Sequence, residues 1–328
     1  MLSLVLRLSL CVSVEGKMDN KYIIETKDLT KRYDGVPVVD GLNFHVKENE
    51  IFGLLGPNGA GKTTTILMLL GLTEPSAGSA VVCSYNPTRE PLQVKRLAGY
   101  MPEKVGFYEN LTARENLRFI ADLNNIPEKE VDAKADELLK AVGIIDVADD
   151  KVGTFSRGMK QRLGIADVLI KSPKLAILDE PTAGLDPDGI LHITELIAGL
   201  PKRGTSVILS SHQLYQVQKV CQSIAIIAKG KLVVQGSIAE LGKKAAAGRC
   251  EIEVETKQPT SELVDNIRKL ETVTSVDVNG DTLLVCADTD LRPDLAKLVV
   301  QSNLPLVQMK IQQLNLDDIY MKYFHEKE

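Results

Sequence analysis

The chain has 328 residues, which is enough for two domains of ordinary size, and its composition is that of a globular protein. The formal net charge is -5 at pH 7, so the chain as a whole is not expected to attract nucleic acid. The 5 cysteines lie far apart and form no C-x-x-C pair, which argues against a disulfide framework or a cysteine metal site. No apolar run approaches the roughly 20 residues that a membrane-spanning helix needs.

The first segment, residues 1–17, alternates leucine and valine with serine and arginine, which is the periodicity of a strand. A signal peptide carries its positive charge before its apolar stretch, whereas Arg7 lies inside this one. We therefore interpret residues 1–20 as an extension outside the fold, with Met18 as the natural start, in preference to an added edge strand.

Strands are predicted over residues 22–55, because these residues are rich in β-branched and aromatic side chains and contain a turn signal at Asp34 and Gly35. They lead into residues 51–70, where an apolar strand breaks into a glycine-rich loop and continues as a helix from Gly61.

This loop, residues 56–63, fits the pattern G-x-x-x-x-G-K-[ST], whose backbone N–H groups surround nucleotide phosphates at a helix N-terminus. We call it the phosphate loop. Glycine lets the backbone come close to an anion. Lys62 would reach the β- and γ-phosphates, and Thr63 would place its hydroxyl on Mg²⁺. The alternative, an ordinary glycine-rich turn, does not require the strand and the helix that flank this loop.

Beyond the phosphate loop, the sequence predicts a short strand over residues 79–85, a helix over 91–98 and a break at 99–103. Helical periodicity then extends to about residue 170, and it opens with a capping box formed by Thr112 and Glu115.

Buried strands are predicted over residues 174–181 and 205–211, with a helix over 188–200 between them. Strands that alternate with helices argue for a mostly parallel sheet. The first strand ends in Asp179 and Glu180, so that one carboxylate can meet Mg²⁺ while the other polarises an attacking water. The alternative is a pair of solvated carboxylates at a strand end.

Residues 154–162 place a hydroxyl and a glycine at the start of a helix, which is again an anion-binding arrangement. Together these segments resemble the ATP-binding-cassette (ABC) ATPases over residues 22–236, with the motifs in the order of that family. The resemblance implies an α/β fold of the P-loop NTPase type within residues 21–240. Its parts would be a mostly parallel sheet core, an antiparallel β subdomain and a helical subdomain at about residues 100–170.

The resemblance also implies a role for each matching residue. Tyr33 would stack on adenine, and Thr63 and Asp179 would hold Mg²⁺. The residues that bind the phosphates of ATP would be Gly56, Pro57, Asn58, Gly59, Ala60, Gly61, Lys62, Thr63 and Thr64. The catalytic residues would be Lys62, Glu103, the general base Glu180 and the γ-phosphate sensor His212. The residues that act across a dimer would be Ser156, Gly158 and Asp186. Tyr33 and His212 also have ordinary alternatives, as a tyrosine packed beside a turn and a histidine at a strand end.

Two positions depart from the usual pattern of the family. Glu103 replaces the loop glutamine, which puts metal contact at that position in doubt. The signature segment, residues 155–159, reads FSRGM instead of L-S-G-G-Q. Both changes resemble the branch that serves ABC-2 type exporters. In addition, glutamine stands where the family often has acidic residues, at Gln216, Gln218 and Gln222.

Residues 250–328 form a second predicted unit, whose elements read in order as β, α, β, β, α, β. Asn279 and Gly280 provide a tight hairpin turn within it. This order predicts a small α+β accessory domain with a ferredoxin-like fold, and an amphipathic helix over residues 315–324 could cover one face.

The sequence therefore predicts the ATP-hydrolysing subunit of an ABC-2 type exporter, with ATP and Mg²⁺ as cofactors. The resemblance implies a head-to-tail homodimer, bound to a separate multispanning membrane subunit at the cytoplasmic face of the membrane. One rival is an ABC protein acting on nucleic acid or ribosomes, which the single cassette and the acidic balance disfavour. A second rival is an ATP-gated regulatory module, which the intact Lys62, Asp179 and Glu180 disfavour.

The segment from Glu103 to Leu111 is the predicted route of coupling to the membrane subunit. One end would lie near the γ-phosphate, while the other presents Phe107, Tyr108 and Leu111. These apolar residues either pack inside the helical subdomain or receive a short helix of the membrane subunit.

Overall fold

The computed structural model describes residues 22–211, 214–245 and 250–312, together with residues 316, 318, 320 and 321. The predicted extension over residues 1–20 lies outside the described residues, as does most of the helix predicted over 315–324. Within the described ranges, no helix is both long enough and apolar enough to cross a membrane.

An antiparallel sheet is built around the long strand β1, and it confirms the predicted antiparallel β subdomain. The backbone turns from β1 into β2 at Asp34 and Gly35, both of which have positive φ angles, of 49° and 80°. The strands of this sheet are β1 (Tyr22–Tyr33), β2 (Val36–Leu42), β3 (His45–Lys47) and β5 (Ala77–Val82).

A six-stranded sheet forms the centre of the molecule in the order β10-β9-β4-β8-β7-β6. All neighbouring pairs are parallel except β10 with β9, so the predicted mostly parallel sheet is confirmed. The strands are β4 (Ile51–Leu55), β6 (Ala98–Met101), β7 (Leu175–Asp179), β8 (Ser206–Ser210), β9 (Ser223–Ala228) and β10 (Lys231–Ser237).

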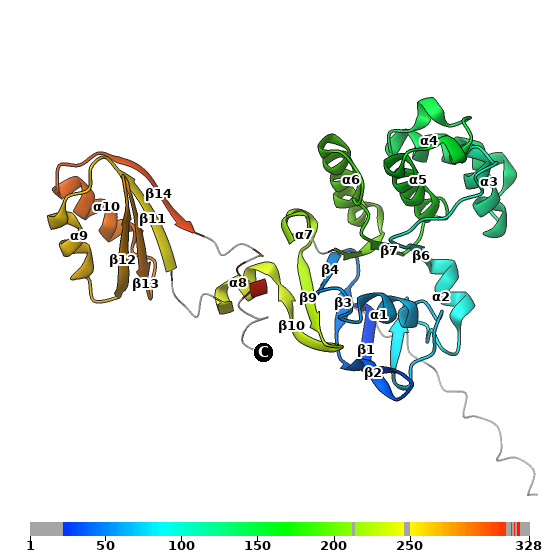
Figure 1. Cartoon of the computed structure of the whole chain (residues 1–328), viewed down its shortest axis with the longest axis horizontal. Coiled ribbons are helices and arrows are strands. Elements are labelled where there is room, and N and C mark those ends of the chain that lie inside the picture. The colour runs from blue at the N-terminus through cyan, green and yellow to red at the C-terminus, as the bar shows by residue number, and fades with distance from the viewer. Residues whose placement is uncertain are drawn as a thin grey trace, which may run out of the picture.

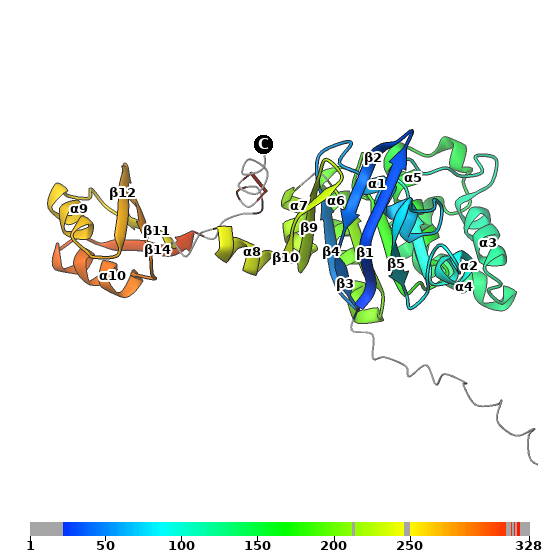
Figure 2. The same ribbon diagram turned by 90° about the horizontal axis from the view of Figure 1, so that it is seen from below.

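Both faces of this sheet are buried, because alternate side chains of each strand point to opposite sides. In β7, Leu175 and Ile177 join a core with α1 (Lys62–Leu69) and the antiparallel sheet. Ala176 and Leu178 join the core on the other face, under the helices. Figure 1 shows the helices of residues 113–141 and 157–199 above β6 and β7, with β1 and β2 below. In the turned view of Figure 2, β1 and β2 lie in front of the helices. Besides α1, the helices of this part of the chain, on either face of the sheet, are α2 (Pro91–Leu97), α3 (Ala113–Leu123), α4 (Glu128–Ala141), α5 (Arg157–Leu169), α6 (Pro187–Gly199), α7 (Leu214–Val220) and α8 (Ile238–Ala245).

The start of α3 confirms the predicted capping box. The backbone N–H of Glu115 donates to Thr112 Oγ1 at 3.1 Å, and the N–H of Thr112 donates to Glu115 Oε2 at 2.8 Å. These reciprocal bonds satisfy two N–H groups that the helix itself leaves free. They fix where the helical region begins after the loop that follows β6.

The last described unit has the predicted βαββαβ order and a core of its own. Its strands are arranged as β12-β13-β11-β14 in an antiparallel sheet, which is the order of a ferredoxin-like fold. Gly280 has a φ of 60° in the hairpin between β12 and β13, as the turn signal predicts. The elements are β11 (Cys250–Thr256), α9 (Ser261–Arg268), β12 (Val273–Asn279), β13 (Thr282–Ala287), α10 (Arg292–Gln301) and β14 (Leu306–Gln312). The exact domain boundaries, 21–240 and 250–328, stay predictions.

Candidate functional site

The phosphate loop connects the fully buried strand β4 to the first residue of α1, Lys62. At two of its glycines, the surrounding atoms leave no room for a side chain. A Cβ on Gly56 would lie 2.2 Å from the carbonyl oxygen of Ile227, and a Cβ on Gly61 would lie 2.7 Å from that of Val38. Gly61 also has a φ of 102°, which L-residues with side chains rarely adopt. The loop can therefore keep this path only with glycine at both positions.

The Lys62 side chain lies across the phosphate loop. Its Nζ donates to the carbonyl oxygens of Gly56 at 2.7 Å and Pro57 at 3.1 Å. Burial lowers the pKa of Lys62, and the nearby carboxylates of Glu180, Asp179 and Glu103 oppose that shift. The ammonium group is therefore held where an anion seated in the loop would meet it.

Asp179 is brought to the phosphate loop by the order of the parallel sheet. The strands β4 and β7 both lie beside β8, so their carboxyl ends meet at one edge. The Thr63 hydroxyl donates to Asp179 Oδ2 at 3.4 Å. Two oxygen ligands of an octahedral Mg²⁺ stand about 3 Å apart, since each lies about 2.1 Å from the metal. This hydroxyl and carboxylate therefore fit a shared Mg²⁺, with phosphate oxygens and water to complete its shell.

The carboxylates here are crowded. Burial raises the pKa of Asp179, and the neighbouring Glu180 raises it further, while Lys62 lowers it. A cation placed between the hydroxyl of Thr63 and Asp179 would favour the ionised carboxylate, because it supplies the charge that the buried site lacks.

These groups surround a pocket of about 150 Å³, which we call the phosphate pocket. It includes Glu103, which replaces the expected loop glutamine, so this carboxylate lines the same pocket as Lys62. The lining residues are Val38, Asn58, Gly59, Gly61, Lys62, Thr63, Thr64, Glu103, Asp179 and Glu180.

Glu180 is held in an uncommon conformation. Its φ is 50°, and three neighbours fix it there. Its N–H donates to the carbonyl of Ser210 at 2.8 Å, its carbonyl accepts from Gln161 Nε2 at 2.8 Å, and its Oε2 accepts from the Ser211 hydroxyl at 3.2 Å. Gln161 and Ser211 carry no sequence signal for a role in the site, although each directly contacts the predicted general base.

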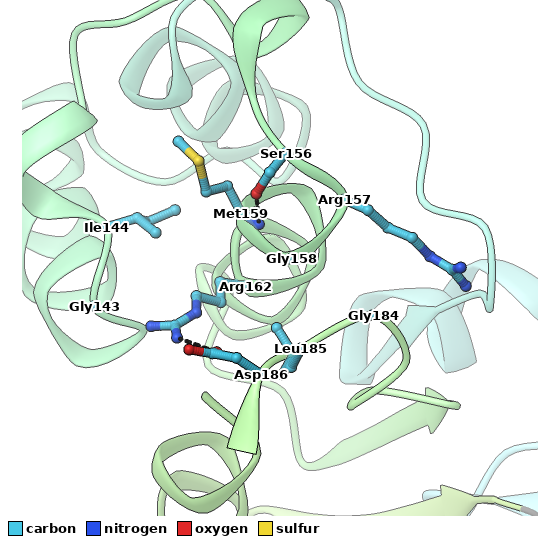
Figure 3. A pocket seen from close by; sticks show the side chains of 10 residues that line it. All are labelled: Gly143, Ile144, Ser156, Arg157, Gly158, Met159, Arg162, Gly184, Leu185 and Asp186. Carbon is cyan, nitrogen blue, oxygen red and sulfur yellow. Dashed lines mark hydrogen bonds and ion pairs between the residues drawn. The ribbon is translucent and has the colours of Figure 1, made fainter. Parts of the chain in front are cut away.

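The signature segment lies elsewhere on the same chain, at a pocket of about 610 Å³ that we call the signature pocket (Figure 3). Ser156 caps α5, because its Oγ accepts from the N–H of Met159 at 3.2 Å. Asp186 caps α6 and lies 3.7 Å from Arg162 Nη2. The lining residues are Gly143, Ile144, Ser156, Arg157, Gly158, Met159, Arg162, Gly184, Leu185 and Asp186.

The structure thus brings together only part of the predicted site. Ser156, Gly158 and Asp186 line the signature pocket and not the phosphate pocket. Tyr33 is 47% exposed at the end of β1, with Lys31 Nζ 5.2 Å from its ring centroid, and it does not line the phosphate pocket. His212 lies outside the described residues. The roles of these residues stay predictions.

The three glutamines near α7 each make a specific contact. Gln216 accepts a hydrogen bond from the Thr182 hydroxyl, two residues beyond Glu180. Gln218 Oε1 accepts from the N–H of Leu316 at 3.0 Å, and Gln222 Oε1 accepts from the N–H of Ile51 at 2.7 Å. These side chains therefore join α7 and the residues just after it to three other segments.

Comparisons with known proteins agree with this arrangement. The family model described as "ABC transporter" matches residues 39–183. The chain is 38% identical over 302 residues to the bacitracin transport ATP-binding protein BcrA of Bacillus licheniformis, covering 92% of this chain and 96% of that protein. It is 33% identical over 307 residues to the linearmycin resistance ATP-binding protein LnrL of Bacillus subtilis (strain 168), covering 91% and 97%.

Among solved structures, an ATP-binding subunit of an ABC transporter superposes with a TM-score of 0.64 at 32% identity, covering 68% of this chain and 92% of that one. The fold, the order of the motifs and these relatives agree. The rival functions on nucleic acid or as a regulatory module are not favoured. The chain belongs to the ATP-binding subunits of ABC transporters, the ATPases that power these transporters.

Proposed function

We propose that this protein is the ATP-hydrolysing subunit of an ABC-2 type exporter and that it works as a head-to-tail homodimer. The observation that carries the proposal is the separation of the two pockets. The phosphate pocket holds Lys62 and the carboxylates but lacks Ser156 and Gly158, which line the signature pocket of the same chain. A second copy, turned head to tail, would place its signature segment over the first copy's phosphate pocket and complete the site.

Within the completed site, the loop N–H groups and Lys62 would bind the β- and γ-phosphates of ATP. Thr63 and Asp179 would hold Mg²⁺, which would supply positive charge for the developing negative charge on the phosphate oxygens. Glu180 would orient and deprotonate the attacking water. The helix N-terminus at Ser156 of the partner would add N–H dipoles on the far side of the γ-phosphate.

The predicted general base gives the test. We expect Glu180→Gln to lower ATP hydrolysis by about a hundredfold or more, because the amide cannot take the proton, while ATP still binds to an intact phosphate loop. ATP with Mg²⁺ should then trap the dimer on size exclusion. Glu195→Gln is the matched control, because Glu195 is exposed on α6. A variant that stays monomeric and hydrolyses at the parent rate would contradict the assignment.

We further propose that this homodimer binds a separate multispanning membrane subunit at the cytoplasmic face of the membrane, and that the membrane subunit docks at Tyr108. Tyr108 is 57% exposed, and its ring packs edge-on against Phe119 at 4.9 Å between centroids. Phe107 instead packs against the core. Val105, in the same segment, packs against α5, since a Cβ on Gly164 would lie 2.8 Å from it. Movement of Glu103 in the phosphate pocket would therefore be passed along this segment to Tyr108.

Export is the direction that the relatives favour. One is named for bacitracin transport and another for linearmycin resistance, and a transporter that confers resistance moves a compound out of the cell. The departures at Glu103 and in the signature segment also match the ABC-2 branch.

We expect Tyr108→Ala to weaken co-purification with the membrane subunit by about 2 kcal/mol, because aromatic anchors often carry much of an interface.

The isolated variant should keep its ATPase rate and melt close to the parent. The exposed edge-on pair that it loses is worth about 0.5–1.5 kcal/mol. Tyr215→Ala is the matched control, since Tyr215 is 66% exposed on α7. A large loss of thermal stability with normal binding to the membrane subunit would show that Tyr108 stabilises the fold and is not the docking residue.

A further inference from the structure

One side chain links the helix that begins at the signature pocket to a residue that lines the phosphate pocket. Gln161 lies in α5, five residues after the cap Ser156, and is only 2% exposed. Its Nε2 donates to the carbonyl of Glu180 at 2.8 Å, across 19 residues of sequence. At about 1.5 Å of rise per residue, roughly 7.5 Å of helix separates the signature pocket from this hydrogen bond. Gln161 lines neither pocket, so it would act on the chemistry only through Glu180.

Glu180 depends on such contacts because its backbone is in the left-handed region, with a φ of 50°. A residue with a Cβ stays there only where its surroundings hold it. The bond from Gln161 fixes the planar peptide group that follows Glu180, while Ser210 fixes the one that precedes it. With both peptide planes fixed, the Glu180 side chain has one direction in which to leave the strand end, toward the phosphate pocket.

The signature end of α5 also touches the loop beyond Glu180. A Cβ on Gly158 would lie 3.2 Å from the carbonyl oxygen of Gly184, so helix and loop are in close contact. A shift of α5 would therefore reach Glu180 through Gln161 and would reach Gly184 directly. The amide of Gln161 is the contact that bears on the predicted general base itself.

We propose that Gln161 is a positioning residue, which sets Glu180 for hydrolysis and couples it to the signature pocket at the start of the same helix. The proposal rests on the dimer described above. In that dimer, the signature pocket of one protomer receives the nucleotide bound by its partner. Nucleotide bound in the signature pocket of one protomer then affects Glu180 of that same protomer, through α5 and Gln161.

The first experiment compares Gln161→Met with the parent, using ATP and Mg²⁺. Methionine keeps the length and the helix preference but has no N–H to donate. We expect kcat to fall about tenfold, while KM and the dissociation constant for ATP stay within about twofold, because the phosphate loop is untouched. Gln93→Met on the exposed face of α2 is the matched control. An unchanged kcat would overturn the proposal.

The second experiment separates positioning of the base from damage to the signature segment. Mixed dimers, purified through two different tags, carry Glu180→Gln in one protomer only. Gln161→Met is added either to that protomer or to the one with the intact base. We expect the activity to fall only in the second arrangement. A fall in the first arrangement would show that the substitution acts through the signature segment, and it would overturn the proposal.

Folding and the proposed function are checked in the same experiments. If Gln161→Met melts clearly below the parent, Gln161→Asn replaces it, because its shorter amide is too distant to reach the Glu180 carbonyl. The same loss of kcat is expected, and its absence would overturn the proposal. If the parent dimer itself hydrolyses no ATP, the proposed function fails, which is distinct from a failure of the inference about Gln161.

Discussion

Asn116 anchors the segment between the phosphate pocket and Tyr108, and its removal should loosen that segment by a measurable amount. The side chain is 3% exposed on α3. Its Oδ1 accepts from the N–H of Tyr108 at 3.0 Å, and its Nδ2 donates to the carbonyls of Tyr108 at 3.1 Å and Thr112 at 2.8 Å. Asn116→Ala loses three hydrogen bonds at about 1 kcal/mol each.

Alanine regains roughly 0.6 kcal/mol of helix preference over asparagine. The net cost is therefore about 2 kcal/mol. Because 1.4 kcal/mol is a factor of ten, amides of the 103–111 segment should exchange with solvent about thirtyfold faster. Hydrogen exchange read by mass spectrometry on the full chain measures this directly.

Asn124→Ala, at the residue that follows the same helix, is the matched control. Asn124 makes one side-chain hydrogen bond, to the carbonyl of Ile120 at 2.8 Å. It should change exchange of the 103–111 segment little. If Asn116→Ala and Asn124→Ala gave the same exchange rates there, Asn116 would not be the anchor, and the route from Glu103 to Tyr108 would need another explanation.

Two further predictions concern pH and the phosphate loop. Burial raises the pKa of Asp167 to about 6, against an ordinary value of 3.8, so its ionisation weakens the fold as pH rises through 6. Asp167→Asn should therefore raise the free energy of unfolding by about 3 kcal/mol near pH 7, and urea titrations should show this gain vanishing as pH falls towards 3.8. Gly61→Ala should cost more than about 1 kcal/mol and abolish ATP binding, because its Cβ would meet the Val38 carbonyl. Gly106→Ala, with open space around its Cβ, should bind ATP normally, and equal binding by both variants would contradict the account of the loop.

The elements that could be predicted from the sequence are those encoded locally. The capping box of Thr112 and Glu115 is fixed by residues three apart, and the strand-loop-helix at the phosphate loop is fixed by glycines in one short pattern. The meeting of Thr63 with Asp179 also follows, because parallel strands place their carboxyl ends at one edge of a sheet.

What could not be predicted depends on packing between distant segments. Gln161 looks like any polar residue of a surface helix, and only the approach of α5 to the end of β7 buries it against Glu180. Phe107 and Tyr108 are adjacent aromatics, and no local pattern decides which packs against the core and which stays exposed. Gln218 accepts a hydrogen bond from Leu316, which lies 98 residues away, so no local sequence pattern could predict this contact.

If each ATP site is shared between two copies of the chain, two inactive variants should restore activity when they are mixed. Ser156→Arg inactivates the signature segment and Lys62→Ala inactivates the phosphate loop. Each homodimer should therefore be inactive. A mixed dimer joins the intact loop of the first variant to the intact signature segment of the second. Purified mixed dimers should regain part of the parent ATPase rate, whereas verified mixed dimers that stay inactive would refute the shared site.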